Sequence, residues 1–365
     1  MESINRMAVE LVDEALDFAE ELGIAAYELD SGATVLDFGV EADGGIEAGL
    51  LLAEIQTAGL ATIQSRTGEV AGAPLPHVEL VTDHPALALL CSQKAGWELT
   101  LDDFDGLGSG PARALVGEES EFQVVGYYDE FDLTVLTVES HLLPGEAVVE
   151  HVAETAAVDP SGVFLPAYAT GSLAGSVTAA ARAAELATFR LFELGYDPTD
   201  VISVSGTAPV APVSYDEGIA MGRSNDAVAY GGRVYLHVRE EFDGFEAVPS
   251  SAADTYGQPF YDVFEDAGWD FHEVEGSAFA PAQITVDVAD DASVATVESD
   301  IQAAYPEYQV RTNREQLQAT LERQAVLIAA GGSLVILAAI AGIALTTNLL
   351  LSLVYQQRAT LAALR

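Results

Sequence analysis

The sequence predicts a mixed α/β protein that ends in a transmembrane helix. Helix-like and strand-like patterns alternate along the first three quarters of the chain, as is typical of mixed α/β architectures. Half of the 365 residues are hydrophobic, so the chain can bury a sizeable core. Residues 325–355 are almost wholly apolar, and about 20 such residues span a bilayer. A buried core helix is the alternative interpretation of that segment.

The elements near the N-terminus follow from helical spacing and turn residues. Residues 5–22 carry apolar side chains at helical spacing and end at Gly23, a residue type that favours helix ends. Ser31-Gly32 joins two short β-like runs in a hairpin. We therefore expect helices at residues 5–22 and 47–58 and strands at residues 25–29 and 34–40.

The later elements are read in the same way. One long helix is predicted at Ser172–Leu194, because Gly195 and Pro198 follow it. Strands are expected at residues 122–128, 133–138, 163–167, 201–204 and 233–238. Residues 290–323 predict a strand, a helix at 292–305 and a second helix with Thr312 as N-cap and Glu315 at the capping-box position.

The charge of the chain is strongly one-sided. Its 58 acidic and 14 basic residues give a formal net charge of −44, of which −41 belongs to residues 1–281. Such an acidic coat repels itself in dilute buffer and suits a salt-rich solvent, where charge is screened within about 3 Å at 1 M. We therefore expect the cytoplasm of a halophilic archaeon. Binding to nucleic acid is disfavoured, because no basic stripe is present to replace phosphate counterions.

Metal and disulfide chemistry are disfavoured as well. The single Cys91 can form neither an internal disulfide nor a thiolate zinc site. The six histidines show no HxxxH or HxxH pair, so we expect no structural or catalytic metal. The first residues, MESINR, run into a charged amphipathic stretch without the apolar core of a signal peptide. The N-terminal part is therefore expected to stay inside the cell.

Composition also singles out one cation. Lys94 is the only lysine beside 13 arginines, and lysine offers a compact ammonium with three rotatable donors instead of a rigid guanidinium fork. We therefore expect a functional ammonium here, against the alternative of a chance survivor. Arg113 follows the small-residue loop at residues 108–112, which places it to offer a guanidinium and backbone N–H groups to an anionic ligand.

Arg182 and Glu185 are three residues apart and therefore share one face of the predicted helix. A solvent-exposed ion pair is the ordinary interpretation of this spacing. Mostly small residues fill positions 174–184, however, and such a helix packs closely or lines a cleft. Because buried charges need partners, Arg182 would keep Glu185 ionised and ready to act as a base.

Two further segments have a plain interpretation as turns. Residues 39–49 (GVEADGGIEAG) form a glycine-rich turn that opens a helix, which alone is weak evidence for phosphate binding. Residues 82–86 (TDHPA) contain an Asp-His-Pro turn.

Nine collinear segments together resemble the methenyltetrahydromethanopterin cyclohydrolase family of archaeal one-carbon metabolism. They are distributed along the chain from residue 39 to residue 282. The segments are GVEADGGIEAGLLLAEI (39–55), GLATI (59–63), TDHPA (82–86), QKAGW (93–97), GSGPARAL (108–115), GSVTAAARAAE (175–185), GTAPVAPV (206–213), GRSNDAVAYGG (222–232) and FAPA (279–282).

The resemblance implies a homotrimer whose subunits fold into two α/β subdomains that enclose a large pocket, without a metal or a bound cofactor. It implies a reaction in which water adds to the methenyl carbon of 5,10-methenyltetrahydromethanopterin and opens the ring to the 5-formyl product. A related pterin carrier, tetrahydrofolate, stays open as an alternative substrate.

The resemblance also implies roles for single residues. Glu185 would activate water, and Arg182 would tune Glu185. The carrier ends in a phosphate and carboxylates, which suits Arg113 and the glycine-rich turns as anion holders. The residues expected to contact the substrate are Lys94, Ser109, Gly110, Arg113, Thr207 and Asn225.

The pattern changes after residue 282. Residues from about 283 to 365 resemble the end of the extracytoplasmic domain and the following membrane helix of ABC-transporter permeases of the FtsX/MacB type. We therefore expect a cyclohydrolase-like domain at 1–282, a permease-like remnant or linker at 283–324, a transmembrane helix at 325–355 and a polar tail at 356–365. The leading hypothesis is a cytoplasmic cyclohydrolase with an acquired or artefactual hydrophobic tail, through which it could associate with a membrane. The alternative is a permease fragment whose large domain is a sensor or binding module.

Removal of salt is expected to unfold the acidic part of the chain. Repulsion among the carboxylates of residues 1–281 is unscreened at low ionic strength, so the compact state loses stability. A circular-dichroism titration from molar to millimolar salt should show the loss of regular structure. A signal that stays flat across this titration would contradict the interpretation of the charge.

Overall fold

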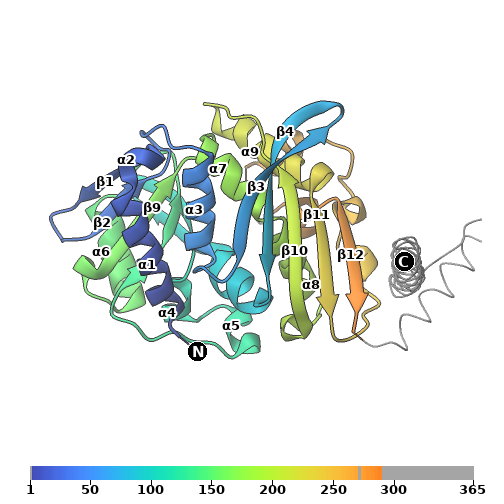
Figure 1. Ribbon diagram of the computed structural model, residues 1–365, viewed down its shortest axis with the longest axis horizontal. Helices are drawn as coiled ribbons and strands as arrows, with labels where there is room; N and C mark the ends of the chain where they lie inside the picture. Colours follow the sequence, from blue (N-terminus) through green and yellow to red (C-terminus); the bar gives the residue numbers. More distant parts are fainter. Residues whose placement is uncertain (1, 270–272, 290–365) are drawn as a thin grey trace, which may run out of the picture. The chain divides into compact units, whose positions relative to one another are not determined.

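Two β-sheets with helices between and beside them make up the fold, as a computed structural model shows (Figure 1). The structure describes residues 2–269 and 273–289, which all belong to one unit that spans residues 1–290. This arrangement confirms the predicted mixed α/β class.

The first sheet mixes parallel and antiparallel strands in the order β1-β2-β9-β8-β6-β5, with β7 beside β9. Its strands are β1 (Ala25–Glu28), β2 (Thr34–Asp37), β5 (Ala95–Leu101), β6 (Phe104–Ser109), β7 (Thr134–Val135), β8 (Thr137–Glu139) and β9 (Val163–Tyr168). Strands β2 and β8 run parallel to β9. Their carboxyl ends therefore meet at one edge of the sheet, which is where ligands of open α/β sheets bind.

The second sheet has the strand order β12-β11-β10-β4-β3. Its strands are β3 (Thr62–Val70), β4 (Ala73–Thr82), β10 (Val201–Pro209), β11 (Arg233–Val238) and β12 (Gln283–Val288). Strand β12 pairs in parallel with β11, and Ile284 and Val286 pack against the core. The structured domain therefore continues past the boundary that we expected at residue 282.

Ten α-helices and one π-helix surround the strands in the described part of the chain. They are α1 (Ile4–Asp17), α2 (Ala19–Leu22), α3 (Ile46–Gln56), the π-helix (Ala86–Gln93), α4 (Arg113–Val116), α5 (Ser120–Val125), α6 (Glu146–Ala156), α7 (Leu173–Ala181), α8 (Ala183–Glu193), α9 (Glu217–Gly231) and α10 (Phe260–Asp266). Side chains of successive strand residues point to opposite faces, so Leu36 joins the core under α1 and α3, and Val35 joins the core under α6. The first sheet is thus covered on both faces.

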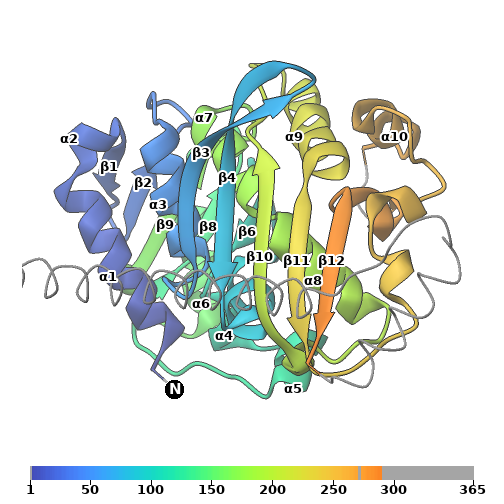
Figure 2. The same cartoon turned by 45° about the vertical axis from the view of Figure 1, so that its right-hand side comes forward.

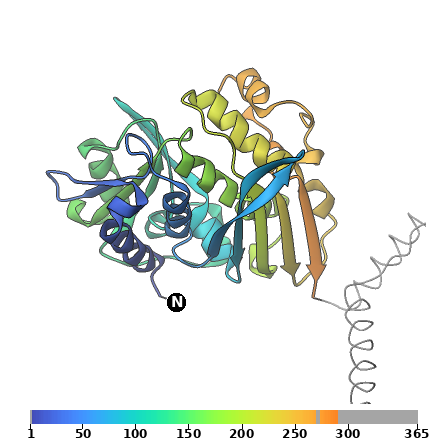
Figure 3. The ribbon, with the colours of Figure 1, turned by 45° about the horizontal axis from the view of Figure 1, so that its top comes forward.

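The second sheet is covered on one face. Helices α7, α8 and α9 pack on its inner face, where Val204 and Leu236 are buried (Figures 2 and 3). Helices α3 and α7 lie between the two sheets (Figure 1). On the outer face, Val81 and Tyr235 are 41% and 38% exposed. No helix of the described residues covers that outer face (Figure 2).

Most of the predicted elements are present. The N-terminal helix, the first hairpin, the helix near residue 50 and the strands at 163–167, 201–204 and 233–238 are confirmed by α1 and α2, β1 and β2, α3, β9, β10 and β11. The strand predicted at residues 122–128 is wrong, because α5 forms there and ends at Gly126 with φ 69°. Short apolar runs do not distinguish a strand from a buried helical turn. The strand predicted at 133–138 is interrupted at Leu136 between β7 and β8.

The helix predicted at Ser172–Leu194 is two helices. Helix α7 ends and α8 begins at Arg182, whose N–H donates to the carbonyl of Ala179, three residues back, at 3.1 Å. Such a local tightening of the helix is a 3₁₀-type turn, and turns of this kind inside a helix often mark functional positions.

The predicted membrane span at residues 325–355 lies outside the described residues, as do the elements expected between 290 and 323. Within residues 2–269 and 273–289, no helix combines the length and the apolar character needed to cross a bilayer.

Gly206 allows α8 to approach strand β10 closely. A Cβ atom at this position would lie 2.8 Å from both the nitrogen and the Cβ of Ala184. We expect Gly206→Ala to push the first turn of α8 away from the sheet and to lower the free energy of unfolding by about 1–3 kcal/mol. Urea unfolding measures this, with Gly145→Ala as control, because a Cβ there meets no atom within 4 Å. Equal stability of the two variants would contradict the close approach.

Candidate active site

Arg182 occupies the break between α7 and α8, with φ −82° and ψ −6°. The end of the π-helix docks at this break. The side-chain amide of Gln93 donates to the carbonyl of Ala181 at 3.4 Å, and the guanidinium of Arg182 donates to the backbone carbonyl of Gln93 at 2.9 Å. The break therefore directs the Arg182 side chain toward the residues that follow the π-helix.

Arg182 and Glu185 form a buried ion pair. Nη1 of Arg182 lies 3.3 Å from Oε2 of Glu185, and the two side chains are 13% and 3% exposed. Burial raises the pKa of Glu185 above the ordinary carboxyl value, and the positive charges of Arg182, Lys94 and Arg113 offset this effect only in part. A carboxylate in this balance accepts a proton more readily than an exposed carboxylate does.

Ser109 holds the other side of the Arg182 guanidinium. Nη2 of Arg182 donates to the Ser109 hydroxyl at 3.2 Å, and this hydroxyl lies 2.8 Å from Oγ1 of Thr137. Ser109 ends β6 and Thr137 begins β8, so the first sheet supplies both hydroxyls. The structure thus brings Ser109, one of the residues expected at the substrate, into contact with the Arg182–Glu185 pair.

A second carboxylate lies at the carboxyl ends of β8 and β9. The Tyr168 hydroxyl donates to Oε2 of Glu139 at 3.3 Å and accepts from the amide of Gln56 at 3.3 Å. Thr170 donates to Oε1 of Glu139 at 2.6 Å. Burial, together with the charge of Glu139, raises the pKa of Tyr168, so its hydroxyl keeps its proton. Sequence reasoning missed this group, because none of its residues belongs to a pattern with chemical meaning of its own.

Lys94 lies against two glutamates and an aromatic ring. Its Nζ is 2.7 Å from Oε2 of Glu119, 2.8 Å from Oε1 of Glu121 and 4.8 Å from the centre of the Phe189 ring. The side chain of Lys94 is 15% exposed. The expected contact of Lys94 with a substrate stays a prediction. Sequence reasoning missed Glu119 and Glu121, since two carboxylates do not stand out among 58 acidic residues.

Arg113 is bound by the protein itself. It makes a bidentate pair with Glu119 at 2.8 and 2.6 Å, and its Nη1 donates to the carbonyls of Leu90, Ser92 and Lys94. Its side chain is only 1% exposed. Protein groups thus occupy the Arg113 guanidinium in this structure, and its expected contact with an anion of the ligand stays a prediction.

Thr207 lies on the outer face of the second sheet. Its neighbour Gly206 faces helix α8, and side chains alternate along a strand, so the Thr207 side chain points away from the Arg182–Glu185 pair. Its hydroxyl accepts from Nη2 of Arg66 at 3.4 Å. The structure does not bring Thr207 to the Arg182–Glu185 pair, and its expected substrate contact stays a prediction.

Asn225 and Gly110 have protein partners as well. The amide of Asn225 donates to the Met221 carbonyl one turn earlier in α9, at 3.0 Å. The backbone N–H of Gly110 donates to the carbonyl of Ser92 at 2.8 Å. The structure joins neither residue to the Arg182–Glu185 pair by a hydrogen bond, and their substrate contacts stay predictions.

The glycine-rich turn at residues 39–49 already binds an anion of the protein. The buried carboxylate of Asp37 accepts the four successive N–H groups of residues 39–42 at 2.6 to 2.9 Å. These donors are occupied, so the structure does not support this turn as a holder of the ligand's phosphate.

Thiol chemistry is excluded by the surroundings of Cys91. Burial raises the pKa of its thiol to about 12, so no thiolate is present at neutral pH. Among the residues that the structure describes, no three His, Cys, Asp or Glu side chains gather in a way that could hold a metal ion.

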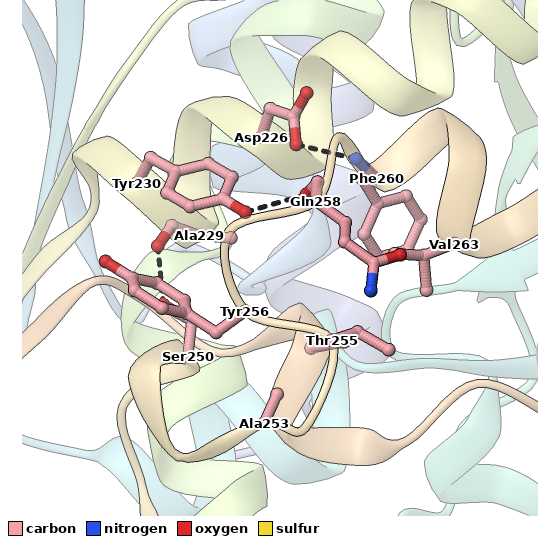
Figure 4. A pocket seen from close by; sticks show the side chains of 11 residues that line it. Asp226, Ala229, Tyr230, Ser250, Ala253, Thr255, Tyr256, Gln258, Phe260 and Val263 are labelled. Carbon is pink, nitrogen blue, oxygen red and sulfur yellow. Dashed lines mark hydrogen bonds between the residues drawn. The ribbon is translucent and has the colours of Figure 1, made fainter.

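Two cavities lie apart from the Arg182–Glu185 pair. The larger, of about 330 Å³, is lined in part by Asp83 and His84 of the TDHPA segment. The smaller, of about 20 Å³, lies beside α9 and α10, where the Tyr230 hydroxyl donates to the Gln258 carbonyl at 2.7 Å (Figure 4). It has room for about one water molecule. Neither cavity is lined by the pair.

The arrangement around Glu185 defines the class of protein. A buried carboxylate with a raised pKa, held against a guanidinium that a serine and a backbone carbonyl fix in place, can take a proton from water. Residues with these roles are typical of the active site of a hydrolytic enzyme that uses a carboxylate base.

Comparison with known proteins gives the family. A model of the cyclohydrolase family (MCH) matches residues 3–303. A protein of Halobacterium salinarum named methenyltetrahydromethanopterin cyclohydrolase is 60% identical over 305 residues, which cover 83% of this chain and 98% of that protein. Proteins of the same name from Methanothermobacter marburgensis and Methanococcoides burtonii are 42% and 40% identical, over 78% of this chain and 92% and 91% of their own lengths. The chain belongs to the cyclohydrolase (MCH) family.

The comparisons also bear on the tail. The family match continues to residue 303, so the first part of the segment expected as a permease remnant belongs to the cyclohydrolase pattern. None of these matches supports a fusion to an ABC-transporter permease, and the permease interpretation of residues 283–365 is not retained.

Proposed function

We propose that this chain hydrolyses the methenyl bridge of 5,10-methenyltetrahydromethanopterin to the 5-formyl product. Family membership and the names of its relatives support the reaction and the substrate class. The observation that carries the mechanism is the Arg182–Glu185 pair, a carboxylate buried beside a guanidinium.

The substrate explains why a carboxylate suits this reaction. The methenyl bridge is an amidinium-like cation, so a negative charge beside it stabilises the bound substrate and takes a proton from the attacking water. The water oxygen bonds to the methenyl carbon, and the bond from this carbon to N10 then breaks. N10 receives a proton and the added hydroxyl loses its proton as the formyl C=O forms. One water is consumed and one proton is released.

Glu185 is the proposed base, and Arg182 tunes it. Burial raises the pKa of Glu185 and so favours its protonated form, which cannot take a proton from water. The charge of Arg182 favours the ionised form, while Ser109 and the Gln93 carbonyl hold the guanidinium in place. The proton that Glu185 takes from water can then be passed to N10.

The substrate is itself the pterin one-carbon carrier, so we propose neither a further cofactor nor a metal. The names of the relatives support tetrahydromethanopterin as the carrier. Methenyltetrahydrofolate is the alternative, and a comparison of kcat/KM for the two methenyl compounds distinguishes them. We further propose that the enzyme acts in the cytoplasm of a halophilic archaeon. The acidic coat and the similarity to a Halobacterium salinarum protein support this location.

We retain the homotrimer as a proposal, and the outer face of the second sheet supports it. At the outward positions of the five strands, Glu79 and Asp287 are balanced by Arg66 and Arg233. This face is neutral in a chain with a net charge of −44, so it does not repel a second copy as the acidic coat does. Light scattering in molar salt tests the association.

Arg182→Met should move the acid side of the pH profile. Glu185 acts as a base only when it is ionised, and the charge of Arg182 lowers its pKa. Without that charge the pKa of Glu185 rises, so kcat/KM should begin to fall at a higher pH than in the wild type. Arg190→Met is the matched control, because Arg190 forms the same i,i+3 pair with Glu193 on α8. If kcat/KM of Arg182→Met begins to fall at the same pH as in the wild type, or at a lower pH, the tuning role is refuted.

Glu185→Gln should keep the fold and substrate binding but lower kcat by about 10²–10⁴, the usual contribution of a general base. Absorbance of the methenyl compound measures the rate. Glu193→Gln serves as the control, since Glu193 lies on the same helix, pairs with Arg190 and is 35% exposed. Hydrolysis by Glu185→Gln at the wild-type rate would show that another group activates the water.

A further inference from the structure

Four charged side chains form a cluster beside the Arg182–Glu185 pair. Lys94 follows the π-helix, Arg113 begins α4, and Glu119 and Glu121 belong to the start of α5. The Lys94 ammonium lies 2.7 Å from Oε2 of Glu119 and 2.8 Å from Oε1 of Glu121. The four charges cancel, and Glu121 and Arg113 are buried.

Arg113 anchors this cluster to the backbone. It binds Glu119 through two nitrogens, and its third nitrogen donates to three carbonyls, including that of Lys94 itself, at 2.8 Å. Although burial by itself raises the pKa of Glu119, hydrogen bonds and charge from Arg113 and Lys94 hold it below the ordinary value. Glu119 therefore stays ionised and keeps both cations. The Arg113–Glu119 pair thus holds both the backbone carbonyl and the ammonium of Lys94.

Lys94 also touches the helix that carries Glu185. Its Nζ lies 4.8 Å from the centre of the Phe189 ring. Phe189 comes four residues after Glu185 in α8, so the two side chains share one face of that helix. The charge of Lys94 acts on Glu185 and lowers its pKa. The ammonium therefore sits within electrostatic reach of the proposed base.

We propose that Glu119 and Glu121 are positioning residues, which hold the Lys94 ammonium at one place beside the Arg182–Glu185 pair. The inference rests on the proposed function and extends it to two residues that no sequence motif indicated. Neither glutamate touches the reacting atoms; both act through Lys94.

A stabilising role alone does not explain this cluster. Taking charges out of water costs free energy that offsets their mutual attraction, so buried ion pairs contribute little net stability. A purely structural pair would also work with arginine, which the chain uses at 13 of its 14 basic positions. An ammonium that two carboxylates hold, with part of its surface still exposed, is suited to a contact that must be made at a defined point.

The single lysine makes the first test direct. A lysine-specific acylating reagent, read by mass spectrometry of the peptide that contains Lys94, reports on this side chain alone. An ammonium held by two carboxylates must leave both before it reacts. We expect Glu119→Gln and Glu121→Gln to speed acylation of Lys94 by about tenfold, the effect of losing one charge-assisted bond. The control Glu118→Gln makes the same charge change at an exposed neighbour and should react as the wild type does.

The second test asks whether the glutamates act through Lys94. In the wild-type background, Glu121→Gln should lower kcat/KM by about tenfold. In a Lys94→Met background the same change should have almost no further effect, because nothing is left to position. Glu119→Asp, which keeps the charge, should recover part of the activity that Glu119→Gln loses. If loss of the Arg113 partner prevents Glu119→Gln from folding, Glu121→Gln carries both tests, since its bond is to Lys94.

The outcomes separate the two proposals. Unchanged acylation in both glutamine variants, or an equal loss of activity with and without Lys94, would overturn the positioning role. A wild-type protein that does not hydrolyse the methenyl compound would contradict the proposed function instead. The acylation rates would still decide whether the two glutamates hold Lys94, because they do not depend on the substrate.

Discussion

The burial of Glu185 beside Arg182 is the constraint on which the rest of the site depends. A carboxylate that is 3% exposed keeps its charge only if positive groups surround it, and the structure collects Arg182, Lys94 and Arg113 for this purpose. Each of these cations then needs partners of its own. Ser109, the Gln93 carbonyl, Glu119 and Glu121 supply them. One buried acid thus determines the polar contacts of several elements.

The helix break makes this arrangement possible. A continuous α-helix would pair the N–H of residue 182 with the carbonyl four residues back. The tight turn between α7 and α8 instead docks on the end of the π-helix, where Gln93 contacts both Ala181 and Arg182. Gly206 in β10 lets the first turn of α8 lie close to the second sheet. Small residues in this region therefore allow α8 to pack closely on the second sheet.

Much of the local structure was predictable, and the errors have physical causes. Helical spacing ended by glycine predicted α1, α2 and α3, and the Ser31-Gly32 turn predicted the first hairpin. The region of α5 was misread as a strand, because a short apolar run fits both periods. The break between α7 and α8 at Arg182 was not predictable from the sequence, because no glycine or proline marks it. Its contacts are with Gln93, which lies 89 residues away from Arg182 in the sequence.

The sequence by itself determined the family, the acidic coat and the pairing of Arg182 with Glu185, because these depend on composition and on spacing within one helix. Only the tertiary structure decided which polar groups meet. It buried Arg113 against Glu119, turned Thr207 to the outer face of a sheet and filled the glycine-rich turn with Asp37. It also brought Glu119 and Glu121 to Lys94. Contacts between distant segments arise from how sheets and helices pack, and a one-dimensional pattern of residue types does not contain that information.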